Sequence, residues 1–319
     1  MEILKVISYL IGGVLVLSWG ANRFVQSASH LARRFGISPV IIGLTVVAFG
    51  TSAPELTVNI IAAVQGNTDL ALGNVVGSNI FNVAFILGIC ALITPLKVSS
   101  QLIKIDIPIM VLISAYLLWC SYDQSISWVE GLTLILGIIL YTVMQIKLSF
   151  KSKNAESEYE QEFSQKGNLK KDLLFLTIGL IALILGANVF VDGAVLGARI
   201  LGWSEAVIGL TIIAAGTSLP EVATSIAATL KGERDIAIGN VVGSNIFNIL
   251  SVIGISAVLS KGGLPVNDHM VKVDLPVMLA LTFLCLPFSL WRKQLDRSVG
   301  ALFIISWIIY TVYLISTTR

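Results

Sequence analysis

Two stretches of this chain, residues 42–82 and residues 208–248, repeat one another. When they are aligned without a gap, each position of the first has its counterpart 166 residues later, and both contain the run GNVVGSNIFN unchanged. Each stretch holds one glutamate, Glu55 or Glu221, directly after a proline in an otherwise apolar segment. Burying a lone carboxylate is costly unless it is paired. Any fold for this chain must therefore give these two carboxylates a partner or a polar cavity.

The composition indicates an integral membrane protein. Of the 319 residues, 55% are apolar and 13% are charged, and the mean hydropathy is +0.88. A soluble core of this size does not need so much apolar surface. The net charge of +2 is too small to favour a nucleic-acid partner, and the three cysteines stand singly, without metal-site or disulfide spacing. The lipid bilayer is therefore the expected surrounding.

Ten segments are long enough to cross a membrane, because a hydrocarbon core about 30 Å thick needs roughly 20 apolar residues per helix. The expected spans are 3–20, 38–64, 70–94, 105–121, 127–147, 173–191, 205–230, 235–259, 273–291 and 299–317. The first has no small-residue cleavage site after it, so we interpret it as a retained span and not as a signal peptide. The polar interval 148–171 is interpreted as a connector.

The repeat extends beyond the two similar stretches. GANRFV at 20–25 is echoed by GANVFV at 186–191. The chain therefore divides into a first half, 1–147, and a second half, 172–319, each with five spans. Because five is odd, the second half must enter the membrane from the opposite side. The sequence predicts an all-α membrane protein with ten transmembrane helices, arranged as two inverted-topology five-helix repeats.

The basic residues predict the orientation. With the connector in the cytoplasm, sixteen of the 21 Lys and Arg residues fall on the cytoplasmic side and five fall outside. This bias follows the positive-inside rule. We therefore expect a multi-pass protein of the cell (inner) membrane, with both termini outside and the central loop cytoplasmic.

Four titratable residues outside the repeated stretches carry weaker signals. Asp106 and Asp274 each stand two residues before a proline, a pattern typical of a helix N-cap, and this role is preferred to ion binding. His30 and His269 fall in predicted loops, one in each half, so they cannot pair as ligands within one half. A role in pH sensing is the weaker interpretation of these histidines.

The prolines before the two glutamates predict breaks in the helices. A proline inside a helix removes one backbone hydrogen bond, and in a membrane the freed carbonyl must find another partner. Pro54 and Pro220 are expected to free carbonyl oxygens about one turn earlier, near Ala48 and Ala214. These oxygens are candidate cation ligands.

Hydroxyl and amide side chains accompany each glutamate at helical spacing. Thr51 and Ser52 stand four and three residues before Glu55, and Ser78 and Asn82 are four apart in the following span. The second half repeats the set as Thr217, Ser218, Glu221, Ser244 and Asn248. Singly, such residues more often pack helices together. Their duplication around two carboxylates favours a site for a hard cation, Ca²⁺ or Na⁺, over zinc, copper or Mg²⁺.

These motifs resemble those of a known family. GTSAPE followed by GNVVGSNIFN, and GTSLPE followed by the same run, are similar to the paired alpha-repeats of the sodium/calcium exchanger family, in the cation/calcium antiporter superfamily. The resemblance covers essentially the whole chain, as in prokaryotic members. It implies that the broken second and seventh helices, with the third and eighth, enclose cation sites while the first and sixth helices slide past. Carried over by motif position, the ligands are Ala48, Thr51, Ser52, Glu55, Ser78, Asn82, Ala214, Thr217, Ser218, Glu221, Ser244 and Asn248.

The chain departs from some family members at two of these positions. Where others carry an aspartate, Asn82 and Asn248 are both amides, which disfavours potassium co-transport. The site then holds two formal negative charges. One Ca²⁺ neutralises them, whereas three Na⁺, the stoichiometry that the resemblance implies, leave a charge of +1. We therefore expect electrogenic exchange of Na⁺ for Ca²⁺ by alternating access.

Other functions stay open at this point. An H⁺/Ca²⁺ exchanger of the same fold is the first alternative, because the glutamates could bind protons instead of Na⁺. A passive cation channel is the second, although broken helices in inverted repeats are typical of transporters. No combination of nucleophile, base and orienting residue indicates an enzyme. We expect a functional monomer that needs no cofactor and no protein partner.

Overall fold

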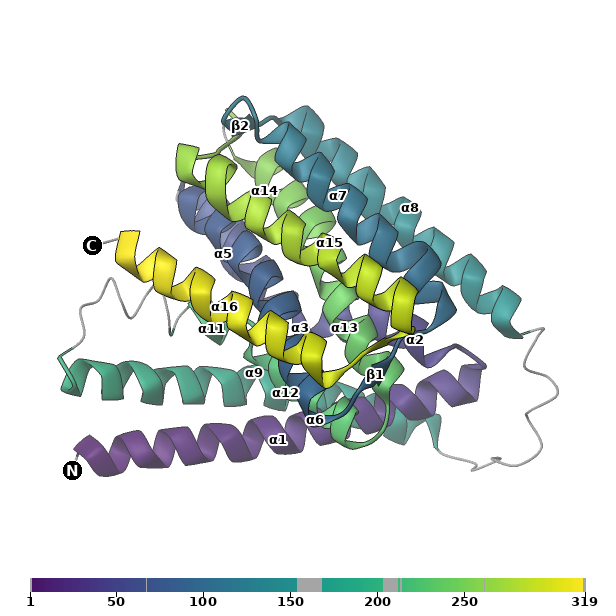
Figure 1. Cartoon of the computed structure of the whole chain (residues 1–319). Helices are drawn as coiled ribbons and strands as arrows, with labels where there is room; N and C mark the ends of the chain where they lie inside the picture. Colours follow the sequence, from purple (N-terminus) through teal and green to yellow (C-terminus); the bar gives the residue numbers. More distant parts are fainter. Residues whose placement is uncertain are drawn as a thin grey trace.

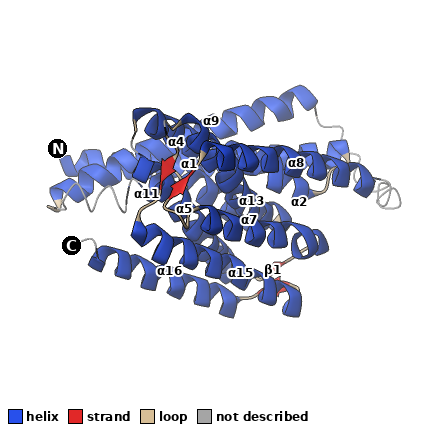
Figure 2. Ribbon diagram, turned by 90° about the horizontal axis from the view of Figure 1, so that it is seen from above, coloured by secondary structure: helices blue, strands red, loops and turns tan. Residues whose placement is uncertain are grey.

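The computed structural model is an assembly of long helices (Figure 1). It describes residues 2–66, 68–153, 168–202, 212, 214–260 and 262–317. In the described part, strands are confined to four two-residue segments, which pair in two places (Figure 2). Most of the connector 148–171 and the start of the expected span 205–230 lie outside the described residues.

The elements follow one another with few interruptions, and η here denotes a π-helical segment. The bounds are α1 Glu2–Phe35, α2 Pro39–Ile42, η1 Gly43–Val47, α3 Ala48–Thr51, α4 Ala53–Gln65, α5 Thr68–Phe81, η2 Asn82–Leu87, α6 Gly88–Ile93, β1 Leu96–Lys97, η3 Leu102–Asp106, α7 Ile107–Cys120, β2 Ser125–Ile126, α8 Trp128–Lys153, α9 Leu169–Ile200, α11 Ala214–Gly216, α12 Leu219–Leu230, α13 Arg234–Phe247, η5 Asn248–Ile253, α14 Gly254–Leu259, β3 Leu264–Pro265, η6 Met270–Asp274, α15 Leu275–Arg292, β4 Gln294–Leu295 and α16 Arg297–Thr317.

The described residues contain eight or nine candidate membrane spans, against the ten predicted from the sequence. Eight described helices are long and apolar enough to cross a membrane, and the pair 39–51 and 53–65, bent by 46°, makes a ninth candidate. The described end of the expected span 205–230 contains the shorter apolar helix α12. The protein is therefore a multi-pass helical membrane protein.

Two predicted spans have the wrong ends. The spans expected at 3–20 and 173–191 belong to α1 and α9, which are 34 and 32 residues long. Counting apolar residues stops at the first polar positions, but α1 continues because Phe24, Ala28 and Ala32 on one face are buried. The predicted loop positions of His30 and His269 are also wrong. His30 lies within α1, and His269 lies in the helical turn that leads into η6.

The helices α1 and α9 lie side by side and antiparallel across the lower end of the steeply inclined bundle, where α1 packs against α12 (Figure 1). Glycines recur at intervals of seven residues along their contact, at positions 13 and 20 of α1 and 179, 186 and 193 of α9. A methyl group at Gly13 would lie 2.7 Å from the backbone nitrogen of Phe190, and one at Gly186 would lie 2.7 Å from that of Leu17. The two backbones therefore touch, as is typical of membrane helices joined through small residues.

Contacts between the two halves of the chain occur in matching pairs. The strand β1 of the first half pairs with β4 of the second, and β2 of the first pairs with β3 of the second. A methyl group at Gly88 would lie 3.2 Å from the carbonyl oxygen of Gly300, and one at Gly131 would lie 2.9 Å from that of Gly254. Thus α16 of the second half packs against α6 of the first, and α8 of the first half packs against α14 of the second.

The π-helical segments also recur at matching positions. Both η2 and η5 begin at the asparagine that ends the GNVVGSNIFN run, Asn82 or Asn248. Both η3 and η6 end at the aspartate that precedes α7 or α15, Asp106 or Asp274. Single π turns in α-helices occur frequently at functional sites.

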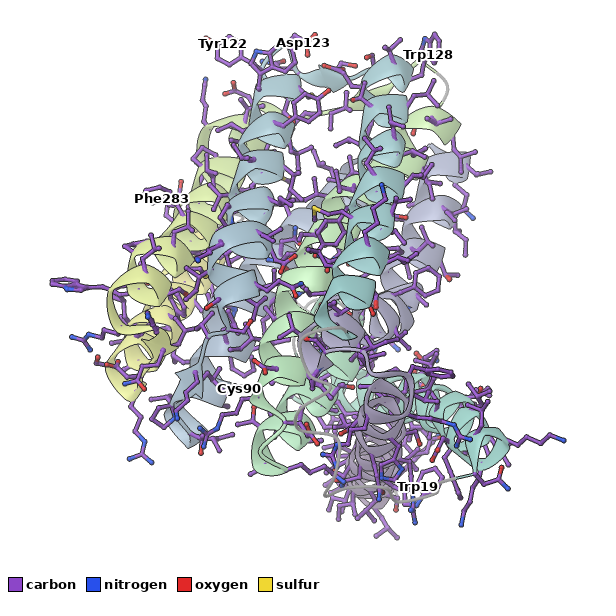
Figure 3. The ribbon with its side chains drawn as sticks, turned by 90° about the vertical axis from the view of Figure 1, so that its right-hand side faces the viewer. Trp19, Cys90, Tyr122, Asp123, Trp128 and Phe283 are labelled. Atoms are coloured by element: carbon purple, nitrogen blue, oxygen red, sulfur yellow. The ribbon has the colours of Figure 1, made fainter. Side chains whose placement is uncertain are left out.

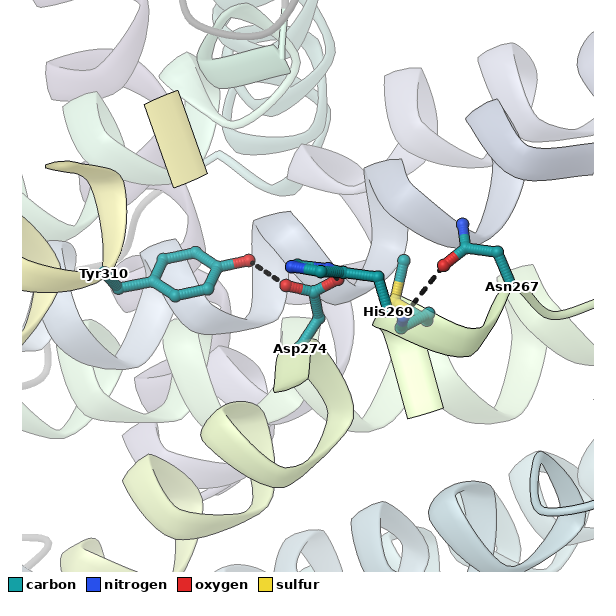
Figure 4. A network of polar contacts seen from close by, with 5 residues as sticks. Asn267, His269, Asp274 and Tyr310 are labelled. Carbon is teal, nitrogen blue, oxygen red and sulfur yellow. Dashed lines mark hydrogen bonds and ion pairs between the residues drawn. The ribbon is translucent and has the colours of Figure 1, made fainter. Parts of the chain in front are cut away.

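The predicted N-cap role of Asp106 and Asp274 is wrong. Neither side chain makes a capping hydrogen bond, because a π-helical segment runs directly into α7 and α15. Instead, Asp106 accepts hydrogen bonds from Tyr141 Oη at 3.0 Å and from Gln145 Nε2 at 2.5 Å. Asp274 accepts one from Tyr310 Oη at 2.9 Å, with His269 beside it (Figure 4). Both aspartates therefore tie their own helix to the next span.

Replacing Tyr141 with phenylalanine should lower stability, because it removes one hydrogen bond from a fully buried carboxylate. Loss of a bond to a charged group costs about 1–3 kcal/mol. We expect a lower melting temperature for Tyr141→Phe in detergent. The matched control is Tyr122→Phe, since the Tyr122 side chain is exposed at the end of the bundle (Figure 3). If both variants melted at the same temperature, the hydrogen bond from Tyr141 to Asp106 would not stabilise the contact between α7 and α8.

The outside of the bundle is apolar, as a lipid-facing surface requires. Trp128 and Phe283 project outward from it (Figure 3), with 59% and 55% of their surface exposed, and Trp19 on α1 is 44% exposed. Trp128 lies with Tyr122 and Asp123 at one end of the bundle. Tryptophan and tyrosine at the ends of spans are typical of the membrane interface.

Candidate functional site

The two repeated stretches meet where a broken helix from each half faces an intact one. The chain leaves helical geometry at Ser52, with φ −84° and ψ 6°, and at Ser218, with φ −88° and ψ 4°. Each break is followed by a proline in the first turn of the next helix, where its missing N–H costs nothing. The breaks place Glu55 and Glu221 in the first turns of α4 and α12.

The prediction that the break leaves the Ala48 carbonyl without its helical partner is wrong. The Ser52 N–H donates to this oxygen at 3.0 Å, so the helical pattern continues until the break itself. The residue four before Pro54 is Gly50, and its carbonyl is the one whose partner the proline removes. Thr51 Oγ1 also lies 3.4 Å from the Ala48 oxygen, so this carbonyl contacts two donors of its own helix.

The glutamates are held by serines from the opposite half of the chain. Ser52 Oγ donates to Glu221 Oε1 at 2.8 Å, and Ser218 Oγ lies 3.1 Å from Glu55 Oε1. Ser218 Oγ also lies 3.0 Å from Ser78 Oγ. Both glutamates are fully buried. Because each glutamate contacts the serine of the other half, the two carboxylates lie close together.

Several oxygens of these residues have no hydrogen-bond partner among the described residues, although they are buried. They are Glu55 Oε2, Glu221 Oε2, Asn82 Oδ1, Asn248 Oδ1 and Ser244 Oγ. Buried polar atoms are nearly always satisfied, and leaving them unsatisfied costs about 1–3 kcal/mol each. A set of carboxylate, amide and hydroxyl oxygens is the ligand chemistry of Ca²⁺ and Na⁺. The donor set thus fits a hard cation.

Nearly all of the predicted ligands lie inside the protein. The buried ones are Ala48, Thr51, Ser52, Glu55, Ser78, Asn82, Ser218, Glu221, Ser244 and Asn248. Thr217 is half-buried, and Ala214 begins α11 with its side chain outside the described part. In the described ranges, no three His, Cys, Asp or Glu side chains gather as a metal site.

Two asparagines that sequence reasoning missed contact the predicted threonines. Thr51 Oγ1 lies 3.1 Å from Asn240 Oδ1, and Thr217 Oγ1 lies 3.3 Å from Asn74 Oδ1. A signal for them was present, because Asn74 stands four residues before Ser78 and therefore on the same helical face. Asn79 and Asn245, which also belong to the repeated run, accept hydrogen bonds from the predicted amides of Asn248 and Asn82.

Comparison with known proteins identifies the family. The sequence profile of the family described as sodium/calcium exchanger protein matches residues 5–147 and 171–316. The chain belongs to this family. Both repeated stretches and all of the predicted ligands fall within the matched residues.

Individual proteins resemble the chain over almost its whole length. The sodium/calcium exchanger MaX1 of Methanosarcina acetivorans is 32% identical and covers 96% of this chain and 97% of its own. The inner membrane protein YrbG of Escherichia coli is 38% identical, with 96% and 95% covered. Among solved structures, the sodium-calcium exchanger NCX_Mj is 31% identical, with a TM-score of 0.85 and 98% and 99% of the two chains covered.

Proposed function

We propose that this chain exchanges Na⁺ for Ca²⁺ across the membrane by alternating access. One observation carries the proposal. Two buried glutamates, one from each half, are each held by a serine of the other half, and the second oxygen of each carboxylate has no partner among the described residues. A carboxylate in a membrane span persists where it has a functional partner. The relatives named as sodium/calcium exchangers support the choice of ions.

The proposed architecture is ten transmembrane helices in two inverted five-helix repeats, 1–147 and 172–319, joined by the connector 148–171. The paired contacts between the halves support it, since β1–β4 and β2–β3 each join one strand of the first half to one strand of the second. The basic residues favour a cytoplasmic connector with both termini outside. The relative named as an inner membrane protein supports placement in the cell membrane.

The ligands proposed for the ions are the oxygen-bearing residues of the repeated stretches. They are Ala48, Thr51, Ser52, Glu55, Ser78, Asn82, Ala214, Thr217, Ser218, Glu221, Ser244 and Asn248. All of them come from a single chain, which favours a functional monomer. Two carboxylates neutralise one Ca²⁺ completely. With three Na⁺ bound instead, the site carries a net charge of +1, so the Na⁺-loaded step of the cycle moves one positive charge across the membrane. Each such charge is worth about 2.3 kcal/mol per 100 mV of membrane potential.

Uptake of radiolabelled calcium into proteoliposomes tests this function. Vesicles loaded with Na⁺ and diluted into Na⁺-free medium should accumulate calcium, and a positive interior should speed uptake because positive charge leaves with Na⁺. Matched vesicles with an outward proton or potassium gradient should stay close to background. Uptake that follows the proton gradient and ignores sodium would replace the proposal with H⁺/Ca²⁺ exchange.

A further inference from the structure

Four asparagines form a reciprocal set of hydrogen bonds between the two halves, close to the proposed site. Asn82 Nδ2 donates to Asn245 Oδ1 at 3.0 Å, and Asn248 Nδ2 donates to Asn79 Oδ1 at 3.1 Å. The other two amides bond to backbone. Asn79 Nδ2 donates to the Asn245 carbonyl at 3.3 Å, and Asn245 Nδ2 donates to the Asn79 carbonyl at 3.2 Å. Every bond crosses from one half to the other, and all four side chains are buried.

This set of bonds determines which end of each amide is available. A backbone carbonyl only accepts, so the amino end of Asn79 must face it and its oxygen must face Asn248. That oxygen in turn requires the amino end of Asn248, whose own oxygen has no partner among the described residues. The same reasoning applies to Asn245 and Asn82. Each proposed ligand amide therefore presents an oxygen, and not an N–H group, on its open side.

We propose that Asn79 and Asn245 are positioning residues that hold the oxygens of Asn248 and Asn82 toward the transported cation, and that they set the preference for Ca²⁺ over Na⁺. The inference rests on the proposed exchange function. The energy between an ion and an oriented dipole scales with ionic charge, so a misdirected amide weakens binding of a divalent cation more than of a monovalent one. Ca²⁺ also needs six to eight oxygens.

The helix geometry supports a role in orientation. The π-helical segments η2 and η5 begin at Asn82 and Asn248, three residues after Asn79 and Asn245. Buried amides need all their polar groups satisfied, yet the two ligand amides each leave an oxygen unpaired while the two positioning amides do not. If the four asparagines served helix packing alone, nothing would require their unpaired oxygens to be those of Asn82 and Asn248 and not those of Asn79 and Asn245.

A pair of mutant cycles tests the inference, because the bonds predict coupling across the halves. Asn79→Ala removes the partner of Asn248 but keeps the backbone carbonyl that holds Asn245. Equilibrium binding of radiolabelled calcium to purified protein, with sodium as competitor, should show about tenfold weaker calcium binding for Asn79→Ala and a smaller change for sodium. Adding Asn248→Ala to Asn79→Ala should weaken binding little beyond Asn248→Ala alone. In the double variant Asn79→Ala with Asn82→Ala, the losses of calcium affinity from the two single substitutions should multiply.

The mirror cycle uses Asn245→Ala, which should couple to Asn82→Ala and be independent of Asn248→Ala. Asn22→Ala is the matched control, since the Asn22 amide is exposed and bonds to its own helix. The inference would be overturned if each positioning variant multiplied the effects of Asn82→Ala and Asn248→Ala alike. It would also be overturned if neither Asn79→Ala nor Asn245→Ala changed calcium binding. Failure of both alanine variants to fold would also overturn it, because the asparagines would then be packing residues. Absence of sodium-dependent calcium transport by the parent protein would instead contradict the proposed function.

Discussion

Glu55→Gln and Glu221→Gln should each abolish calcium transport while the protein stays folded. Each glutamate supplies half of the formal charge of the proposed site, so one substitution leaves Ca²⁺ with an uncompensated charge. Removing one partner of a buried charge pair costs about 3–5 kcal/mol, which corresponds to a loss of at least about 100-fold. Folding should survive, because a glutamine oxygen can still accept the hydrogen bond from Ser218 or Ser52.

The measurement is sodium-dependent calcium uptake into proteoliposomes, with melting temperature as the test of folding. Glu130→Gln is the matched control, because Glu130 lies in the first turn of α8 and accepts hydrogen bonds from Ser127, the residue before that helix. It should transport like the parent. Near-normal uptake by a folded Glu55→Gln or Glu221→Gln variant would show that the carboxylates do not bind the ion.

Gly13→Ala should strongly disturb the contact between α1 and α9, whereas Gly12→Ala should not. A methyl group at position 13 would lie 2.7 Å from the backbone nitrogen and 2.8 Å from the Cα of Phe190, and backbone atoms cannot turn aside. Overpacking of this kind costs about 1–3 kcal/mol. At Gly12 no atom lies within 4 Å, so alanine adds helix propensity of up to about 1 kcal/mol.

Melting temperature and transport rate, measured for both variants, check this prediction. Gly13→Ala should melt lower and transport more slowly, and Gly186→Ala should behave in the same way, because its methyl would meet the backbone of Leu17. Gly12→Ala should match or exceed the parent in stability. Equal behaviour of the two neighbouring alanine variants would contradict the close antiparallel packing of these helices.

The meeting of the two repeated stretches was predictable because their pattern is duplicated. A proline, a glutamate and hydroxyl residues at helical spacing occur in each half, and two buried carboxylates need a common partner. What the pattern could not give is which half supplies each partner. The bond from Ser52 to Glu221 joins residues 169 positions apart, and such a contact depends on how two helices approach one another. Asn79 and Asn245 were missed for the same reason, since their hydrogen bonds form only across the halves.

Other errors came from local rules that tertiary structure overrides. Asp106 stands where an N-cap is expected, but the π-helical segment before it supplies a continuous helix and leaves the carboxylate to Tyr141. The helix α1 extends past its apolar run because packing sustains it. The π-helical segments were not predicted, although they recur at matching positions in the two halves. Hydropathy placed the spans 3–20 and 173–191 within α1 and α9 but missed the ends of these helices, since helix ends depend on packing.

The central claim is that calcium crosses only in exchange for another cation, and calcium efflux tests it most directly. Proteoliposomes loaded with radiolabelled calcium are diluted into media that contain Na⁺, Ca²⁺ or an impermeant organic cation. Efflux should be rapid with Na⁺ or Ca²⁺ outside and close to background with the organic cation, because an empty site would have to carry two bare carboxylates through the membrane. Rapid efflux into the medium with the organic cation alone would contradict exchange and indicate a channel.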